Sequence, residues 1–147
     1  MGDILENGKS YMAQVNSILI IDDDPLFLLL VKKTIMKYEL AKNISAFSNG
    51  LEAFDALKQS INDPSALPDI ILLDINMPIM DGWEFLEEFL PFLEKTTKKI
   101  SIYIATSSIA EDDKRKAKTY PTIKDYLLKP IDQPILNRII EAHLQQQ

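Results

Sequence analysis

Apolar and polar residues follow two different patterns along the chain, and each pattern predicts one kind of element. Short apolar runs, typical of buried strands, occupy residues 17–21, 44–47, 69–74, 100–106 and 125–128. A segment with the composition or spacing of a helix follows each run. Strands that alternate with helices favour a parallel sheet with helices on both faces. The pattern therefore predicts a doubly wound α/β domain with a five-stranded parallel sheet.

Local signals indicate where the helices start. Proline suits the first turn of a helix, as at Pro25, and Asn49 and Glu52 have the spacing of a capping box. We expect an interruption or a kink near Pro91, because proline lacks the amide hydrogen of a helical turn. The segment 62–68, which contains two prolines, is predicted to be a loop. The expected helices start near Pro25, Asn49, Gly82, Glu111 and Pro134.

The first predicted helix has an apolar face and a second apolar patch. The residues expected on its buried face are Phe27, Leu30, Val31, Thr34, Ile35 and Tyr38. Helical geometry then turns Leu28 and Leu29 outward. Adjacent exposed leucines form a candidate docking patch, with Pro130 and Ile131 at its edge. The alternative is that the N-terminal segment folds over them.

Composition narrows the possible functions. The chain has 147 residues, which suggests one domain, and we expect a loose leader over 1–16 and the folded domain over 17–147. There is no cysteine, so thiolate metal sites are excluded. A net charge of −6 argues against nucleic acid as a partner. No apolar run has the length of a membrane span and no secretory signal is present, so we expect a cytoplasmic protein.

Charged and hydroxyl residues stand where the predicted strands end. Residues 22–24 are three consecutive aspartates, and Asp74, Thr106 and Lys129 follow or end three other strands. The carboxyl ends of parallel strands share one edge of the sheet, where ligands bind in such folds. Two carboxylates about 4 Å apart repel by roughly 4 kcal/mol at an effective dielectric near 20. Either a positive charge offsets this repulsion, or the acids point apart into water.

Four segments together resemble one known family. They are IIDDDP, DIILLDINMPIMDGWEFL, IATSS and DYLLKP, and the likeness extends over residues 17–143. The chain resembles the response-regulator receiver domains of two-component signalling, and in particular the stand-alone receivers of the chemotaxis type. This resemblance implies a flavodoxin-like (βα)5 fold with strand order 2-1-3-4-5.

The resemblance also implies roles for the acidic residues. Asp74 corresponds to the phosphoacceptor, and Asp22 and Asp23 to the acidic pair that binds Mg²⁺ or Mn²⁺. Asn76 corresponds to the residue whose backbone carbonyl completes the metal site. We expect Asp24 to be a helix cap or a solvated charge.

The remaining roles fall on the last two strands. Thr106 corresponds to the hydroxyl that binds the phosphoryl group, and Lys129 to the ammonium that pairs with it. Tyr126 corresponds to the aromatic that changes rotamer with Thr106, and Pro130 to the proline of a cis bond. Two serines follow Thr106 where the family usually has Ala or Gly, so Ser107 remains an alternative for the hydroxyl.

The implied function is transfer of a phosphoryl group from a phosphohistidine donor onto an aspartate. The implied partners are a sensor histidine kinase or a histidine phosphotransfer protein, and an unidentified downstream protein; no output domain is evident. We expect the protein to catalyse only its own phosphorylation and dephosphorylation, and no other reaction. One alternative is a haloacid-dehalogenase-like phosphatase, which needs a second aspartate where Asn76 stands, and another is a receiver that is not phosphorylated. We expect His143 to be solvated or half-buried.

Overall fold

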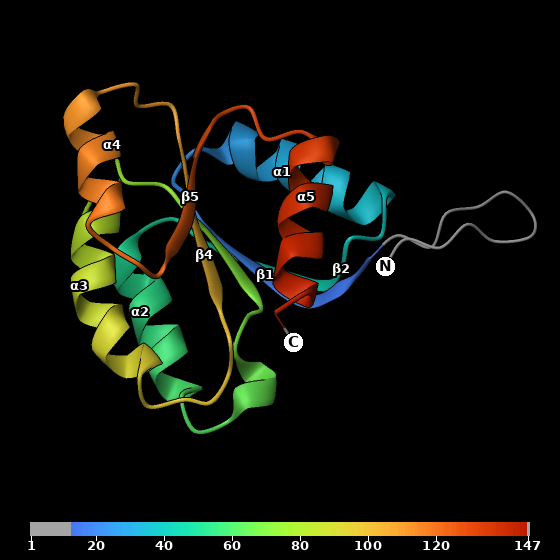
Figure 1. Ribbon diagram of the computed structural model, residues 1–147, viewed down its shortest axis with the longest axis horizontal. Helices are drawn as coiled ribbons and strands as arrows, with labels where there is room; N and C mark the ends of the chain where they lie inside the picture. The colour runs from blue at the N-terminus through green and yellow to red at the C-terminus, as the bar shows by residue number, and fades with distance from the viewer. Residues whose placement is uncertain (1–12, 147) are drawn as a thin grey trace, which may run out of the picture.

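Five parallel strands form one sheet in the computed structural model, which describes residues 13–146 (Figure 1). Their order is β2-β1-β3-β4-β5, so the predicted 2-1-3-4-5 topology is confirmed. The strands are β1 (Val15–Ile21), β2 (Ala41–Phe47), β3 (Ile70–Leu73), β4 (Ser101–Thr106) and β5 (Ile123–Leu128). The helices are α1 (Pro25–Lys37), α2 (Gly50–Gln59), α3 (Gly82–Leu93), α4 (Glu111–Lys118) and α5 (Gln133–Leu144), with a short 3-10 helix at Pro64–Ala66.

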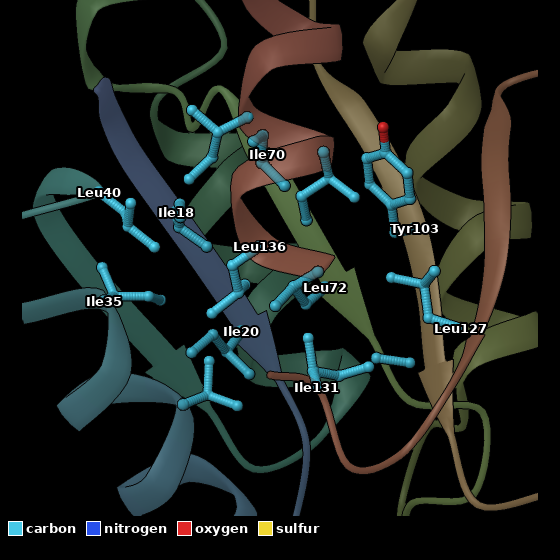
Figure 2. Close-up of a cluster of buried hydrophobic side chains, with 14 of the residues drawn as sticks. Ile18, Ile20, Ile35, Leu40, Ile70, Leu72, Tyr103, Leu127, Ile131 and Leu136 are labelled. Atoms are coloured by element: carbon cyan, nitrogen blue, oxygen red, sulfur yellow. The ribbon is translucent and has the colours of Figure 1, made fainter. Parts of the chain in front are cut away.

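Two separate cores form because side chains alternate between the faces of each strand. Helices α1 and α5 cover one face of the sheet, and α2 and α3 cover the other (Figure 1). In β1, Ile18 and Ile20 pack into the α1/α5 core, which Figure 2 shows, while Leu19 and Ile21 pack into the α2/α3 core. All four residues of β3 are buried, as expected for a central strand covered on both faces.

Helix α4 is attached differently from the other helices. Its only buried residue is Ala117. Trp83, at the start of α3, stacks on Tyr120 just after α4, with 5.8 Å between the ring centroids, and the Nζ atom of Lys116 lies 5.0 Å from the centroid of the Trp83 ring. Aromatic and cation–π contacts therefore join α3 to α4 where an apolar core is nearly absent.

Several element boundaries differ from the sequence prediction. Strand β1 begins at Val15, two residues inside the predicted leader, and Val15 is buried in the α1/α5 core. Residues 1–12 of that leader lie outside the described residues. Helix α3 continues past Pro91 to Leu93, and the loop at 62–68 contains the 3-10 helix. Among residues 13–146, no helix has both the length and the apolar character that a membrane span requires.

The predicted faces of α1 were partly wrong. The buried stripe is Phe27, Val31 and Ile35, a spacing of four residues that centres the helix on Val31. Because successive residues are about 100° apart, Leu30 turns out of the interface and is 53% exposed. Leu28, predicted to point outward, lies closer to the stripe and packs against the α1/α5 core. Tyr38 is 37% exposed because the helix has already ended.

The prediction for His143 was wrong as well. The last turn of α5 lies against the amino ends of β3 and β4, and His143 is only 1% exposed. Its Nδ1 atom is 2.8 Å from the hydroxyl of Ser101, and its Nε2 atom is 3.7 Å from a carboxylate oxygen of Asp69. Asp69 accepts hydrogen bonds from the amides of residues 16 and 17 and pairs with Lys98 at 2.6 Å. This cluster fastens the C-terminal helix to the edge of the sheet opposite the predicted site.

Candidate metal and phosphoryl site

Two of the predicted acidic residues are positioned by the sheet itself. Asp22 directly follows β1 and Asp74 directly follows β3, and both are buried. The backbone amide of Asp22 donates a hydrogen bond to the carbonyl of Phe47 at 3.0 Å. The backbone amide of Asp74 donates one to the carbonyl of Ile21 at 2.9 Å. These bonds extend the parallel hydrogen-bonding pattern by one residue, so the backbone that carries each carboxylate is fixed.

Asp24, the last of the three consecutive aspartates at 22–24 (the acidic run), has a different role. Asp24 is the N-cap of α1, where its Oδ1 atom accepts hydrogen bonds from the amides of Leu26 and Phe27 at 3.0 and 3.4 Å. The predicted helix cap is thus observed. Asp22 Oδ1 in turn accepts from the amide of Asp24 at 2.9 Å, which holds the turn between β1 and α1.

Three carboxylates converge at this edge of the sheet. One oxygen each from Asp22, Asp23 and Asp74 lies within 4.8 Å of the other two. Burial raises the pKa of Asp22, and the neighbouring Asp74 raises it further, against the lowering effect of Lys129 and of the Asp24 amide. The exposed Asp23 provides the open side of the cluster. Such a group of oxygens costs electrostatic free energy unless a cation lies among them.

The donor set fits a divalent cation. Carboxylate oxygens with an open, solvated side are the ligands that Mg²⁺ and Mn²⁺ prefer. The buried Oδ2 atom of Asp22 accepts no well-aligned hydrogen bond, and its ion-pair partner is the ammonium of Lys129. The backbone amide of Asn76 donates a hydrogen bond to Asp74 Oδ1 at 3.4 Å. The backbone of Asn76 therefore lies beside the cluster.

Lys129 provides positive charge at this site. Its Nζ atom is 2.7 Å from Asp22 Oδ2 and 3.4 Å from Asp74 Oδ2, and it lies 4.4 Å from the ring centroid of Phe27. Burial alone lowers the pKa of Lys129, but the two carboxylates outweigh this effect and the pKa is raised. The Lys129–Pro130 bond is cis, as the resemblance implied.

The hydroxyl at the end of β4 belongs to Thr106. This residue ends the strand and is buried, whereas Ser107 is exposed, so the structure favours Thr106 over the alternative. The carbonyl of Thr106 accepts a hydrogen bond from the amide of Lys129 at 2.9 Å. This bond ties the ends of β4 and β5 together beside the acidic cluster.

Tyr126 is linked to the same loop. Its phenol donates a hydrogen bond to the carbonyl of Ser108 at 2.9 Å. Burial raises the pKa of Tyr126, as do the charges of Asp113 and Asp74, while the bond to Ser108 acts in the opposite direction. The candidate switch residues therefore meet at the loop between β4 and α4.

The sequence prediction used Gly82 only as a helix start and misplaced two docking residues, Leu28 and Ile131. A Cβ atom at Gly82 would lie 2.4 Å from the carbonyl oxygen of Asp74, so α3 starts in direct contact with the loop that follows β3. The glycine in the MDG segment was the available signal. Ile131, predicted at the edge of a docking patch, is 5% exposed because it packs into the α1/α5 core, while Pro130 is exposed.

Comparisons with known proteins agree with this geometry. Residues 18–141 match the sequence model of the response regulator receiver domain. Protein PilH of Pseudomonas aeruginosa is 31% identical over 127 residues, which cover 86% of this chain and 96% of PilH. Other curated relatives are longer, and the chain spans between 14% and 54% of several of them.

Solved structures give the same result. A two-component response regulator from Cytophaga hutchinsonii is similar with a TM-score of 0.78 and 27% identity, covering 90% of this chain and 98% of that one. The Mn²⁺-bound form of response regulator Rcp1 is similar with a TM-score of 0.66 and 27% identity, over 86% of this chain and 90% of that one. Receiver domains bind Mg²⁺ or Mn²⁺ at an acidic pocket and are phosphorylated by histidine kinases. From its topology, its acidic site and these similarities, the chain belongs to the family of response regulator receiver domains.

Proposed function

We propose that this protein accepts a phosphoryl group on Asp74 from a phosphohistidine donor and signals through the change that follows. The observation that carries the proposal is the convergence of three carboxylates within 4.8 Å, with the ammonium of Lys129 in contact with two of them. Phosphoryl transfer depends mainly on positioning and on neutralising charge, and this site provides both.

Each residue has a defined role in the proposed transfer. A carboxylate oxygen of Asp74 forms the new bond to phosphorus while the bond from phosphorus to the donor imidazole breaks, and the imidazole nitrogen keeps the electron pair. A divalent cation bound by Asp22, Asp23, Asp74 and the carbonyl of Asn76 would supply positive charge opposite the phosphoryl oxygens. Lys129 and the hydroxyl of Thr106 contact the same oxygens from the β4 and β5 side.

We propose that the protein has no general enzymatic turnover. The chain promotes only its own phosphorylation and the later hydrolysis of the aspartyl phosphate. A phosphatase of the haloacid-dehalogenase type would need a carboxylate where Asn76 stands. We infer a cytoplasmic protein whose partners are a kinase or phosphotransfer protein and a downstream protein, with no nucleic acid or membrane partner, in keeping with its net charge of −6.

Intact-mass measurement tests the site. Wild-type protein incubated with acetyl phosphate and Mg²⁺ should gain one phosphoryl group, and chelation of the metal should prevent the gain. Asp74→Asn should gain none. Asp24→Asn is the matched control, because asparagine also caps helices and Asp24 points to α1 rather than to the cluster. Equal labelling of Asp74→Asn, or release of phosphate in many turnovers, would contradict the proposal.

The phosphodonor is proposed to dock on the exposed end of α1. Leu26, Leu29 and Leu30 are exposed there, next to the turn that carries the acidic run, and Pro130 is exposed on the loop after β5. This set replaces the predicted one, because Leu28 and Ile131 pack inward. Leu29 is 49% exposed, so Leu29→Ser should slow transfer from the cognate kinase and leave labelling by acetyl phosphate unchanged. Leu51→Ser, at an exposed leucine of α2, is the control; equal transfer rates in both variants would contradict this docking face.

A further inference from the structure

Every polar group of Ser108 is engaged, and its partners come from three different elements. Its amide donates to the Thr106 hydroxyl at 3.2 Å, and its carbonyl accepts from the Tyr126 phenol at 2.9 Å. Its own hydroxyl donates to a carboxylate oxygen of Asp113 at 2.6 Å and accepts from the amide of Ala110 at 3.3 Å. Ser108 therefore connects the end of β4, the side chain on β5 and the first turn of α4.

The bond to Asp113 holds a helix that has few other attachments. Ala110 is the N-cap of α4 and offers no side chain to cap it. Ala117 is the only buried residue of the helix. A short hydrogen bond to a carboxylate is among the stronger hydrogen bonds in proteins. The pair formed by Ser108 and Asp113 is therefore a main determinant of where α4 begins relative to β4.

We propose that Ser108 and Asp113 are positioning residues that form a latch, and that this latch opposes the phosphorylated arrangement of the β4–α4 loop. The inference rests on the proposed function, because it concerns the response of Thr106 to a phosphoryl group on Asp74. In the unphosphorylated protein the latch fixes Ser108, and Ser108 in turn fixes both switch residues.

The opposition follows from the geometry of the loop. A Thr106 hydroxyl that moves toward a phosphoryl group stretches its 3.2 Å contact with the Ser108 amide. Ser108 cannot follow that movement while its own hydroxyl is bound to Asp113 at 2.6 Å. Either the contact to Thr106 or the latch must therefore break. In both cases the phosphorylated arrangement loses one of these two hydrogen bonds, and a variant without the latch avoids this conflict, so removal of the latch should shift the equilibrium toward that arrangement.

Beryllium fluoride with Mg²⁺ provides the test, because it mimics a phosphoryl group on a carboxylate without covalent transfer. Its apparent affinity is measured by titration followed in two-dimensional amide NMR spectra. Ser108→Ala and Asp113→Ala should each bind it roughly threefold to tenfold more tightly, the range set by one lost hydrogen bond. The double variant should bind no more tightly than Ser108→Ala, because Ser108→Ala already lacks the bond to Asp113.

Asp112→Ala is the matched control. It also removes one carboxylate from the first turn of α4, but Asp112 is exposed and pairs with Arg115 on its own helix. Its affinity for beryllium fluoride should stay within twofold of wild type. The affinity of all variants for Mg²⁺ alone should be unchanged, because Asp22, Asp23 and Asp74 are intact.

The outcomes separate the latch from the proposed function. Unchanged or weaker affinity in Ser108→Ala and Asp113→Ala, or additive effects in the double variant, would overturn the latch. Wild-type protein that binds no beryllium fluoride would overturn the proposed function instead. In that event the latch is still tested in the free protein: both single variants should shift the amide resonance of Ala110 further than Asp112→Ala does, and equal shifts overturn the latch by themselves.

Discussion

Lys129 and its two carboxylate partners account for the charge balance in the buried part of the site. The ammonium contacts Asp22 and Asp74 but not the exposed Asp23, so it neutralises the two buried acids and leaves the solvent side open. The face of Phe27 below the ammonium adds a further favourable contact for the positive charge. Lys129 therefore offsets the charge of the two buried acids, whereas the exposed Asp23 lies outside these ion pairs.

Gly82 should be intolerant of any side chain. In Gly82→Ala the added methyl group would lie 2.4 Å from the Asp74 carbonyl oxygen, so α3 or the loop must move. We expect a loss of roughly 1–3 kcal/mol in the free energy of unfolding, typical of overpacking, together with slower labelling by acetyl phosphate. Urea denaturation and intact-mass kinetics measure the two effects. A variant with wild-type stability and labelling would show that the contact is easily relieved.

Residues that follow a strand were predictable and residues of the loops were not. An aspartate directly after an apolar strand, as at positions 22 and 74, must lie at the carboxyl edge of a parallel sheet. Ser108 and Gly82 matter because of the paths of two loops, and no periodicity encodes a loop path. The two serines after Thr106 were recognised in the sequence as a departure from the family. The hydrogen bond from Ser108 to Asp113 could be found only in the structure.

At the scale of elements, α5 is fastened at its C-terminal end by ionisable groups. His143 is buried against Ser101, and the charged groups that act on it are Asp69, Lys98 and Lys124. Burial lowers the pKa of His143 below its ordinary value, which outweighs the favourable effect of Asp69. The neutral imidazole is therefore the form that the folded protein prefers.

This burial predicts a loss of stability in mild acid. The unfolded chain binds a proton at His143 near pH 6.5, and the folded protein does so only at lower pH. The contribution is thus complete above about pH 6.5 and is lost as the pH falls toward the folded pKa. The urea midpoint should fall more between pH 7.5 and 5.5 in wild type than in His143→Gln, which does not titrate. The pKa of Asp69 is lowered, so its own contribution is lost only below about pH 4 and does not interfere. Equal slopes would contradict the assignment.

The sequence predicted the number, type and order of the helices and strands. It predicted only part of the exposed face of α1. The apolar runs fixed the strands because a covered parallel strand needs apolar side chains on both faces. Helix α1 has leucines around most of its circumference, so its pattern was compatible with several orientations. The sheet selects the stripe centred on Val31, and this selection depends on tertiary packing.

At the scale of the whole molecule, the acidic site lies where the two cores meet the carboxyl edge of the sheet. Strands β1 and β3 lie side by side at the centre and carry Asp22 and Asp74 at their ends. A cation bound between these ends would link the two central strands as well as the charges. Metal binding is therefore expected to stabilise the entire fold and not the site alone.

Thermal and urea unfolding with and without Mg²⁺ test this expectation. Ligand linkage gives about 2.7 kcal/mol of added stability when free Mg²⁺ exceeds its dissociation constant a hundredfold. Asp23→Ala should lose most of this gain while keeping nearly the same stability without metal, because Asp23 is exposed. Asp55→Ala, at an exposed aspartate of α2, should respond to Mg²⁺ as wild type does. An equal response in Asp23→Ala would place the metal elsewhere.

The contact between α3 and α4 has an optical consequence. Trp83 is the only tryptophan of the chain, so all indole fluorescence comes from the place where Tyr120 stacks on it and Lys116 lies over its ring. Excitation redistributes charge within an indole ring, so its emission energy depends on a cation held nearby. If phosphorylation displaces α4, Lys116 leaves the ring and the emission maximum shifts. The protein thus carries an intrinsic spectroscopic reporter for the separation of α3 and α4, which requires no added label.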